Sequence, residues 1–276
     1  MIQPAVSSVQ IKKVTGSIVA DSPDLLAIEE PMEIRLNFGK GKWKQQKNVA
    51  VTMRTPGNDF ELASGFLITE GIVKSFHDIL FIRHCEEGNN IVKIDIKEDV
   101  VVDTHSMDRN FYTTSSCGIC GKTSVDAVKF YSGGKITYDN VRTEPSYLSA
   151  LPEKLRMQQN IFEFTGGLHA AALFNREGDL LFIREDVGRH NAVDKLIGAA
   201  AASIELPLYN YILLLSGRAG FELLQKAAVA GIGIVAAVGA PTSLAVEMAE
   251  EAGITLVGFL RDNRFNIYTH PQRIKI

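Results

Sequence analysis

The sequence has 276 residues, of which 46% are hydrophobic and 22% charged, as is ordinary for a globular protein with a substantial core. Its net charge of −3 excludes a generally basic surface of the kind that holds nucleic acid by counterion release, so no nucleic-acid partner is predicted. The most apolar stretch, residues 227–241, is shorter than the roughly 20 residues of a membrane span and contains three glycines, so no membrane association is predicted.

The first third of the chain is predicted to form a small, β-rich α+β domain over residues 1–108. Apolar and polar side chains alternate from Met32 to Phe38, which is the period of a strand with one buried face. Residues 55–58 have a turn sequence, and Asn58 or Asp59 can cap a helix that follows it. The predicted elements are, in chain order, strands over residues 32–38 and 48–54, a helix with Leu62, Phe66 and Leu67 on one face, and a hairpin of strands over residues 79–85 and 91–96.

The rest of the chain, residues 109–276, is predicted to form an α/β domain that opens with a cysteine-containing segment. Residues 98–114 show no apolar period and are expected to be a connection. Strands that alternate with helices favour a mostly parallel sheet covered on both faces. The predicted helices are 122–131, 146–159 with Ser146 as cap, 189–203, 221–230 and 242–252, and the predicted strands are 168–174, 180–184, 211–216, 232–238 and 255–260.

The chain has three cysteines, Cys85, Cys117 and Cys120, and this small, odd number argues against a disulfide framework. The N-terminus lacks the basic region and apolar run that mark a secretory signal. Both observations favour a reducing, cytoplasmic compartment. In such a compartment, a closely spaced thiol pair is expected to do chemistry rather than to form a structural disulfide.

Cys117 and Cys120 form a single Cys-x-x-Cys pair, which by itself is compatible with four kinds of site. It can be half of a zinc site, although no second pair is present. It can be a thioredoxin-like disulfide exchanger, although the preceding residues 108–116 are polar and do not form a predicted strand. It can carry a persulfide, since Gly118 and Gly121 give the backbone freedom to move between a donor and an acceptor. It can also simply fill core space, which the neighbouring glycine, serine and threonine residues disfavour.

Polar and glycine-rich segments follow several predicted strands of the second domain, and the ends of strands in open α/β sheets are where ligands usually bind. Their arginines can pair with phosphate, and Asp262 and Asn263 can read a base edge. His169 can lie at the other side of the same pocket, or it can be a buried imidazole with satisfied hydrogen bonds. None of the segments matches the P-loop or the dinucleotide-binding fingerprint. A pocket for a phosphate-bearing ligand is predicted from four segments, residues 185–191, 216–220, 239–243 and 260–266.

Taken together, these motifs resemble the FdhD/NarQ family, the formate dehydrogenase accessory sulfurtransferases. The resemblance covers most of the chain, from about Pro56 to the C-terminus, and the joint occurrence of the motifs is far more specific than the thiol pair alone. It rests on residues 55–57, 66–71, 115–121, 165–169, 185–191, 216–218 and 259–266.

The resemblance implies a cytoplasmic sulfur carrier that tends to form homodimers. Members take sulfur from a cysteine desulfurase and pass it to the molybdenum cofactor before the cofactor enters formate dehydrogenase. Cys117 falls on the position of the persulfide-bearing cysteine, and Cys120 is expected to assist exchange or to resolve the product. The cofactor is a client in its bis(molybdopterin guanine dinucleotide) form. Its guanine nucleotide moiety is expected to bind at His169, His190, Phe259, Leu260, Arg261, Asp262, Asn263 and Arg264.

The larger domain of this family is similar to the cytidine deaminase fold, a three-layer αβα sheet domain. Deaminases of that fold hold zinc with an H-x-E element and a P-C-x-x-C element. In this sequence Ala171 stands where the glutamate would be and Ser116 precedes Cys117, so no metal site is predicted. Sulfur relay is therefore the favoured hypothesis. The alternatives are a molybdenum-cofactor chaperone that binds without catalysis and a zinc-dependent enzyme of deaminase type.

Overall fold

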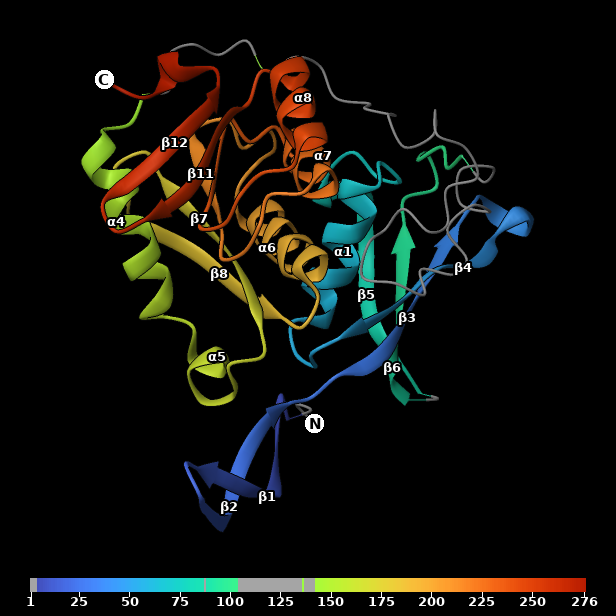
Figure 1. Cartoon of the computed structure of the whole chain (residues 1–276). Helices are drawn as coiled ribbons and strands as arrows, with labels where there is room; N and C mark the ends of the chain where they lie inside the picture. The colour runs from blue at the N-terminus through green and yellow to red at the C-terminus, as the bar shows by residue number, and fades with distance from the viewer. Residues whose placement is uncertain (1–3, 87, 104–135, 137–141) are drawn as a thin grey trace.

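The computed structural model describes residues 4–86, 88–103, 136 and 142–276. These residues form a six-stranded sheet with helices on both faces, a four-stranded sheet and a two-stranded arm (Figure 1). The α/β class predicted from the sequence is confirmed. In the part of the chain that is described, no helix is long and apolar enough to cross a membrane.

The six-stranded sheet has the order β12-β11-β10-β9-β7-β8 and mixes strand directions. The prediction of a mostly parallel sheet is wrong, since two of its five strand pairs, β9–β10 and β10–β11, are parallel. The short turns over residues 176–179 and 262–263 reverse the chain and make β7–β8 and β11–β12 antiparallel hairpins. The strands are β7 (His169–Asn175), β8 (Leu180–Asp186), β9 (Tyr211–Leu215), β10 (Ile234–Ala237), β11 (Thr255–Arg261) and β12 (Arg264–Thr269).

Alternate residues of this sheet point into two separate hydrophobic layers, as expected for strands buried on both faces. Ala171 and Leu173 of β7 belong to the layer that contains α6, α7 and α8. Ala170 and Phe174 belong to the layer on the other face, which contains α4. The result is the predicted three-layer arrangement. The helices are α4 (Pro145–Arg156), α5 (Asn160–Thr165), α6 (Arg189–Ser203), α7 (Phe221–Val229) and α8 (Ser243–Ala252).

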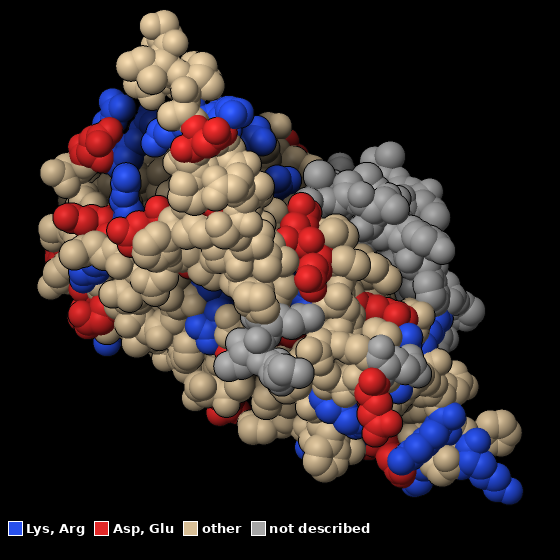
Figure 2. All heavy atoms as spheres, turned by 90° about the horizontal axis from the view of Figure 1, so that it is seen from below, with Lys and Arg blue, Asp and Glu red and all other residues tan. Residues whose placement is uncertain are grey.

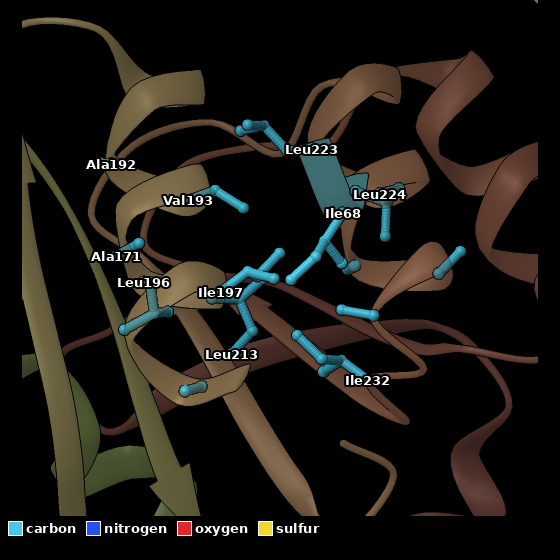
Figure 3. Packing of buried hydrophobic residues seen from close by; sticks show 14 of the residues in the cluster. Ile68, Ala171, Ala192, Val193, Leu196, Ile197, Leu213, Leu223, Leu224 and Ile232 are labelled. Atoms are coloured by element: carbon cyan, nitrogen blue, oxygen red, sulfur yellow. The ribbon is translucent and has the colours of Figure 1, made fainter. Parts of the chain in front are cut away.

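Figure 3 shows the first of these layers from close by. Ile197 of α6 lies in the cluster with Leu213 of β9 and Leu224 of α7, and all three side chains are almost inaccessible to solvent. Ile68, from a helix in the first third of the chain, joins the same cluster. One continuous core therefore connects the six-stranded sheet with the N-terminal part of the chain.

The four-stranded sheet has the order β4-β3-β6-β5, and its buried face packs on helix α1. Met32, Ile34 and Leu36 of β3 are fully buried there, as the alternating sequence pattern predicted. The predicted division into residues 1–108 and 109–276 stays a prediction. The elements are β3 (Glu30–Phe38), β4 (Gln45–Arg54), α1 (Asp59–Thr69), β5 (Ile79–Cys85) and β6 (Gly88–Ile96), with short 3-10 turns at Gly41–Trp43, Phe76–Asp78 and, near the C-terminus, Pro271–Arg273.

Helix α1 packs directly on α6, and two glycines allow the contact. A Cβ atom on Gly65 would lie 1.8 Å from the carbonyl oxygen of Asp194, and a Cβ atom on Gly198 would lie 2.0 Å from that of Glu61. Both distances are far below van der Waals contact. The backbones of the two helices therefore touch, which fixes the position of α6 relative to the N-terminal sheet.

β1 (Val6–Thr15) and β2 (Ile18–Ala27) form a hairpin arm that projects from the body at the bottom of Figure 1. The arm is not predicted from the sequence, because most of its side chains are exposed and its apolar residues do not alternate with polar ones. Val14, Ile18 and Val19 at its tip are each more than 60% exposed. An isolated two-stranded hairpin is only marginally stable in water.

Two further details differ from the prediction. Helix α4 begins at Pro145, with Glu144 rather than Ser146 as its N-cap, because proline is favoured in the first turn of a helix. The predicted helix 146–159 ends three residues early, at Arg156, and the separate helix α5, which starts at Asn160, was not predicted. The predicted helix 122–131 lies outside the described residues.

The surface seen in Figure 2 carries both signs of charge. Lysine and arginine side chains are interspersed with aspartate and glutamate, and much of the middle of this face is uncharged. This distribution agrees with the net charge of −3. It differs from the one-signed surface that non-specific binding of nucleic acid requires.

Candidate functional site

One edge of the six-stranded sheet collects most of the residues that the sequence analysis singled out. β9, β10 and β11 end there, because they are parallel. β8 also ends there and β7 begins there, because β7 runs antiparallel to both neighbours and His169 pairs with Asp186. We call this edge the rim. It consists of His169 and residues 185–191, 216–220, 239–243 and 259–264.

The loops of the rim are joined to each other by hydrogen bonds. The Ser216 hydroxyl accepts a bond from the backbone N–H of Ala170 at 2.8 Å. The Gly239 N–H donates to the carbonyl of Gly217 at 2.9 Å, and the Phe259 N–H donates to the carbonyl of Gly239 at 3.0 Å. The starts or ends of four neighbouring strands are thus held in one arrangement. A rigid edge of this kind is suited to hold a ligand without rearrangement.

Gly239 has a specific steric role in this arrangement. A Cβ atom there would lie 3.0 Å from the carbonyl oxygen of Gly217 and 3.1 Å from the Cα of Arg218. Any larger residue would push the two loops apart. The glycine therefore sets the spacing between the loops that follow β9 and β10.

His169 lies at the start of β7, beside the loop that follows β9. Its Nδ1 would be 3.4 Å from a Cβ atom placed on Gly217. Burial lowers the pKa of His169, and electrostatic interactions with Arg189 and His190 lower it further. The imidazole is therefore neutral near pH 7 and can accept a proton or a hydrogen bond.

A buried cluster of polar side chains holds the first turn of α6 in place. The Asp186 carboxylate accepts bonds from the backbone N–H groups of Thr55 at 3.2 Å and Gly188 at 2.8 Å. It also pairs with the Lys195 ammonium at 2.7 Å, and both side chains are almost completely buried. Lys195 in turn donates to the Thr55 carbonyl at 2.8 Å. The turn at residues 55–57 and the motif at residues 185–191 are therefore parts of one structure, which positions Arg189 and His190.

The carboxylate of Glu185 is also engaged within the protein. It accepts bonds from the backbone N–H groups of Ile161 and Phe162 at 3.0 and 2.9 Å, at the start of α5. Carboxylates stabilise helix N-termini in this way. Glu185 and Asp186, which the sequence suggested as candidate site groups, thus support the rim.

Glu222 is a rim-proximal residue that the sequence analysis missed. Its Oε2 lies 2.5 Å from Nε2 of His190, and both side chains are close to nine-tenths buried. Glu222 is in the first turn of α7 and His190 in the first turn of α6. The spacing of His190–Asp194 and Glu222–Lys226, four residues in each case, is the only sequence signal that could have suggested the pairing.

The predicted segment 259–264 is a hairpin rather than a loop. Asp262 and Asn263 form its two-residue turn with φ of 52° and 56°, and Arg261 pairs with Arg264 across it. Phe259 has a φ of 54°, which is rare for a bulky side chain and is found at sites where the surroundings enforce it. Here Phe259 lies at an irregularity in the β11–β12 pairing between Gly258 and Arg261, and its N–H donates to Gly239.

Most side chains of this hairpin face solvent, with one exception. Phe259, Arg261, Asp262, Asn263 and Arg264 are exposed. Leu260 is fully buried in the layer with α4, so its backbone, not its side chain, is what a ligand could contact.

Cys117 and Cys120 lie outside the described residues. Cys85, at the end of β5, is buried. Over the described ranges, no three His, Cys, Asp or Glu side chains are grouped as metal ligands would be.

The comparisons with known proteins agree on one family. The FdhD/NarQ family model matches residues 27–275. The sulfur carrier protein FdhD of Streptomyces avermitilis is 49% identical to this chain, over 97% of this chain and 95% of its own length. The protein of the same name from Sulfolobus acidocaldarius is 45% identical, over 98% and 99% of the two chains.

A solved structure shares the fold. The crystal structure of "a putative formate dehydrogenase accessory protein" from Desulfotalea psychrophila aligns with 99% of this chain and 100% of its own, with a TM-score of 0.77 and 22% identity. Since the family model covers residues 27–275 and the relatives align over almost their whole length, this chain belongs to the FdhD/NarQ family.

Proposed function

We propose that this chain is a sulfur carrier for formate dehydrogenase and that the rim binds the guanine nucleotide part of its client, the bis(molybdopterin guanine dinucleotide) form of the molybdenum cofactor. The printed names of the relatives support the carrier role. One observation carries the binding proposal. Four rim arginines have no ion-pair partner among the described residues: Arg189, Arg218, Arg261 and Arg264.

Uncompensated arginines are suited to phosphate, because the guanidinium fork donates two parallel hydrogen bonds to phosphate oxygens. Of the three rim carboxylates, Asp186 is paired with Lys195 and Glu185 accepts hydrogen bonds from the start of α5, which leaves Asp262, in the turn between Arg261 and Arg264, to balance the four arginines. The rim is therefore locally positive although the chain is acidic overall. A diphosphate group would supply the missing negative charge.

The dimensions of the rim favour an extended ligand. β9 and β10 separate β7 from β11 in the sheet, which puts about 14 Å between the His169 end and the Phe259 end at the usual strand spacing. One phosphate cannot contact both ends, whereas a nucleotide with a diphosphate and a further group can. The exposed ring of Phe259 offers a surface on which a base can stack.

The sulfur chemistry proposed for the carrier follows from thiol exchange. The Cys117 thiolate attacks the terminal sulfur of the desulfurase persulfide. The sulfur–sulfur bond of the donor then breaks, and the desulfurase cysteine leaves as a thiolate. Cys120 can later attack the Cys117 sulfur, so that a disulfide forms and hydrosulfide leaves toward the molybdenum. The two electrons come from the thiol pair, which a cellular dithiol reductant restores.

The persulfide step can be tested by incubating the protein with a cysteine desulfurase and cysteine, followed by intact-mass spectrometry. Wild type should gain the mass of one sulfur, and the Cys117→Ala variant should not. A gain that survives this substitution contradicts the role of Cys117, and no gain in wild type contradicts the relay.

Two alternatives are separated from the relay by simple measurements. A chaperone that binds the cofactor without sulfur chemistry predicts that the double variant Cys117→Ala/Cys120→Ala still activates formate dehydrogenase in cells. A zinc enzyme of deaminase type predicts one zinc ion per chain in metal analysis of the purified protein.

We further propose a homodimer in which the β1–β2 arm contacts a second copy. The apolar tip, formed by Val14, Ile18 and Val19, supports this because such a surface is usually covered in the working assembly. Light scattering should show a dimer for wild type and a monomer for the triple serine variant at these positions. Met157→Ser, at an equally exposed apolar residue of the body, should leave the mass unchanged. The cytoplasmic location remains a prediction from the sequence and the resemblance.

A further inference from the structure

Two side-chain contacts, one helical turn apart, connect α6 to α7. The contact nearer the rim joins His190 to Glu222 at 2.5 Å. The next joins Asp194 of α6 to Lys226 of α7 at 3.0 Å. In both helices the contacting residues are four positions apart, so both contacts lie on the same pair of helix faces.

The two contacts differ in how many of their polar atoms have a hydrogen-bond or ion-pair partner. Lys226 also donates to the Thr69 hydroxyl at 2.9 Å and pairs with Glu70 at 3.1 Å, so this contact is satisfied from three elements. Burial alone would lower the pKa of Lys226, but the carboxylates of Asp194 and Glu70 raise it, so the ammonium stays charged. This inner contact is a structural tie between α1, α6 and α7.

The contact at the rim is incomplete. Nδ1 of His190 and Oε1 of Glu222 are both buried and have no hydrogen-bond partner among the described residues. Such atoms are uncommon in folded proteins, and a role in function is one of the established reasons for them. His190 follows Arg189 in the sequence, and both residues interact electrostatically with His169. The incomplete contact is thus adjacent to the groups proposed to bind the ligand.

The chemistry of a carboxylate–histidine pair determines which ring nitrogen remains available. A carboxylate accepts only, so Nε2 of His190 must carry the proton that is shared with Glu222. In the neutral ring Nδ1 then has a free lone pair, and in the protonated ring it has a free N–H. Either form leaves one defined nitrogen for a further partner.

We propose that Glu222 is a positioning residue of the rim: it holds His190 in the Nε2–H tautomer and so fixes the imidazole ring beside Arg189, which is proposed to bind the ligand. The proposal rests on the proposed function for the identity of the ligand, but the tautomer itself does not depend on it. Residues that orient a metal-bound histidine through its other nitrogen typically change affinity or activity by about 10–100-fold when removed, and an effect at the lower end of this range is expected here.

The experiment measures the tautomer and the function separately. The protein is labelled with nitrogen-15 in its histidine rings, and His190 is assigned by the loss of its signals in His190→Gln. At about pH 8, where an ordinary imidazole is neutral, wild type should show Nε2 protonated and Nδ1 bare. In Glu222→Gln the amide can either donate or accept, so a mixture of the two tautomers should appear.

The same proteins are then tested for binding of GDP by calorimetry, with GDP as a probe for the nucleotide part of the client. Glu222→Gln should weaken binding by about 10-fold or more. Glu247→Gln, an exposed carboxylate on α8, is the matched control and should change neither the tautomer nor the affinity. Thermal melting of each variant shows whether the fold is retained.

Three results would overturn the inference. They are an Nδ1–H tautomer in wild type, an unchanged tautomer in Glu222→Gln, and a mixed tautomer with unchanged GDP affinity. Failure of the proposed function gives a different pattern, because wild type itself would then bind no GDP while the His190 tautomer would still depend on Glu222.

Discussion

Gly65 of α1 and Gly198 of α6 meet where the two helices cross, so closely that a Cβ atom on Gly65 would lie 2.9 Å from the backbone nitrogen of Gly198. The same Cβ atom would lie 1.8 Å from the Asp194 carbonyl oxygen. Since neither obstacle is a flexible side chain, only a shift of a whole helix can make room. This contact connects the N-terminal sheet to the helix that carries Arg189 and His190.

Gly65→Ala should therefore destabilise the protein by about 3 kcal/mol, at the upper end of the usual cost of overpacking. For a chain of this length the melting temperature should fall by roughly 5 °C. The control is Gly167→Ala, where the nearest atom to an added Cβ lies at 3.8 Å. A melting temperature of Gly65→Ala equal to that of the control would show that the helices can separate at little cost.

The rim arginines should determine nucleotide affinity. Removing Arg261 or Arg264 by substitution with serine should weaken GDP binding about tenfold each, the typical loss for a hydrogen bond to a charged group. Binding should also weaken as salt is added. Arg176→Ser, in the β7–β8 turn at the opposite edge of the sheet, should bind as wild type does. Equal weakening by Arg176→Ser would point to a non-specific charge effect.

The two cysteines should separate in their effects. We expect Cys120→Ala to acquire the persulfide at Cys117 normally but to release it slowly, because the attacking thiol is gone. Time-resolved mass spectrometry after removal of the desulfurase measures both steps. If Cys120→Ala gains as much sulfur as wild type and releases it as fast, Cys120 has no part in the relay.

His169 should make stability depend on pH. Burial, followed by the charges of Arg189 and His190, lowers its pKa in the folded protein below the ordinary value of 6.5. The unfolded chain therefore binds a proton more readily, so the contribution of His169 is fully present above about pH 6.5 and is lost as the pH falls through the lowered folded pKa.

The contribution of His169 can be isolated by measuring the melting temperatures of wild type and His169→Gln between about pH 5 and pH 8. The fall in melting temperature on acidification should be smaller in the variant than in wild type. His77→Gln, at an exposed histidine, should retain the wild-type dependence. Parallel curves for wild type and His169→Gln would contradict the lowered pKa.

Much of the fold could be predicted because the patterns are local. Alternation in β3 and the helical period of α6, whose predicted bounds match the structure, depend only on neighbouring residues. The direction of β7 relative to β9 could not be predicted, because the apolar pattern of a strand does not show which way the strand runs in the sheet. In addition, β9 begins 36 residues after the end of β7. The arm was missed because neither of its faces is buried.

Part of the rim could also be predicted, because its patterns are local as well. Segments that directly follow strands could be recognised, and the structure brings them to one edge. Glu222 could not be recognised, because its partner His190 is on a different helix and the pairing depends on how α6 and α7 pack. Leu260 could be assigned to the rim segment 259–264 from its motif. That its side chain points into the core could not be predicted, because this depends on how the hairpin packs.

The antiparallel course of β7 has a consequence for how the protein matures. Because His169 begins one strand and Phe259 lies near the end of another, 90 residues later, the rim is an assembly of sequence-distant segments. Contacts of this kind form late in folding, when the entropy of closing long loops has already been overcome. A partly folded chain therefore has no intact rim, and any ligand of the rim selectively stabilises the completely folded molecule.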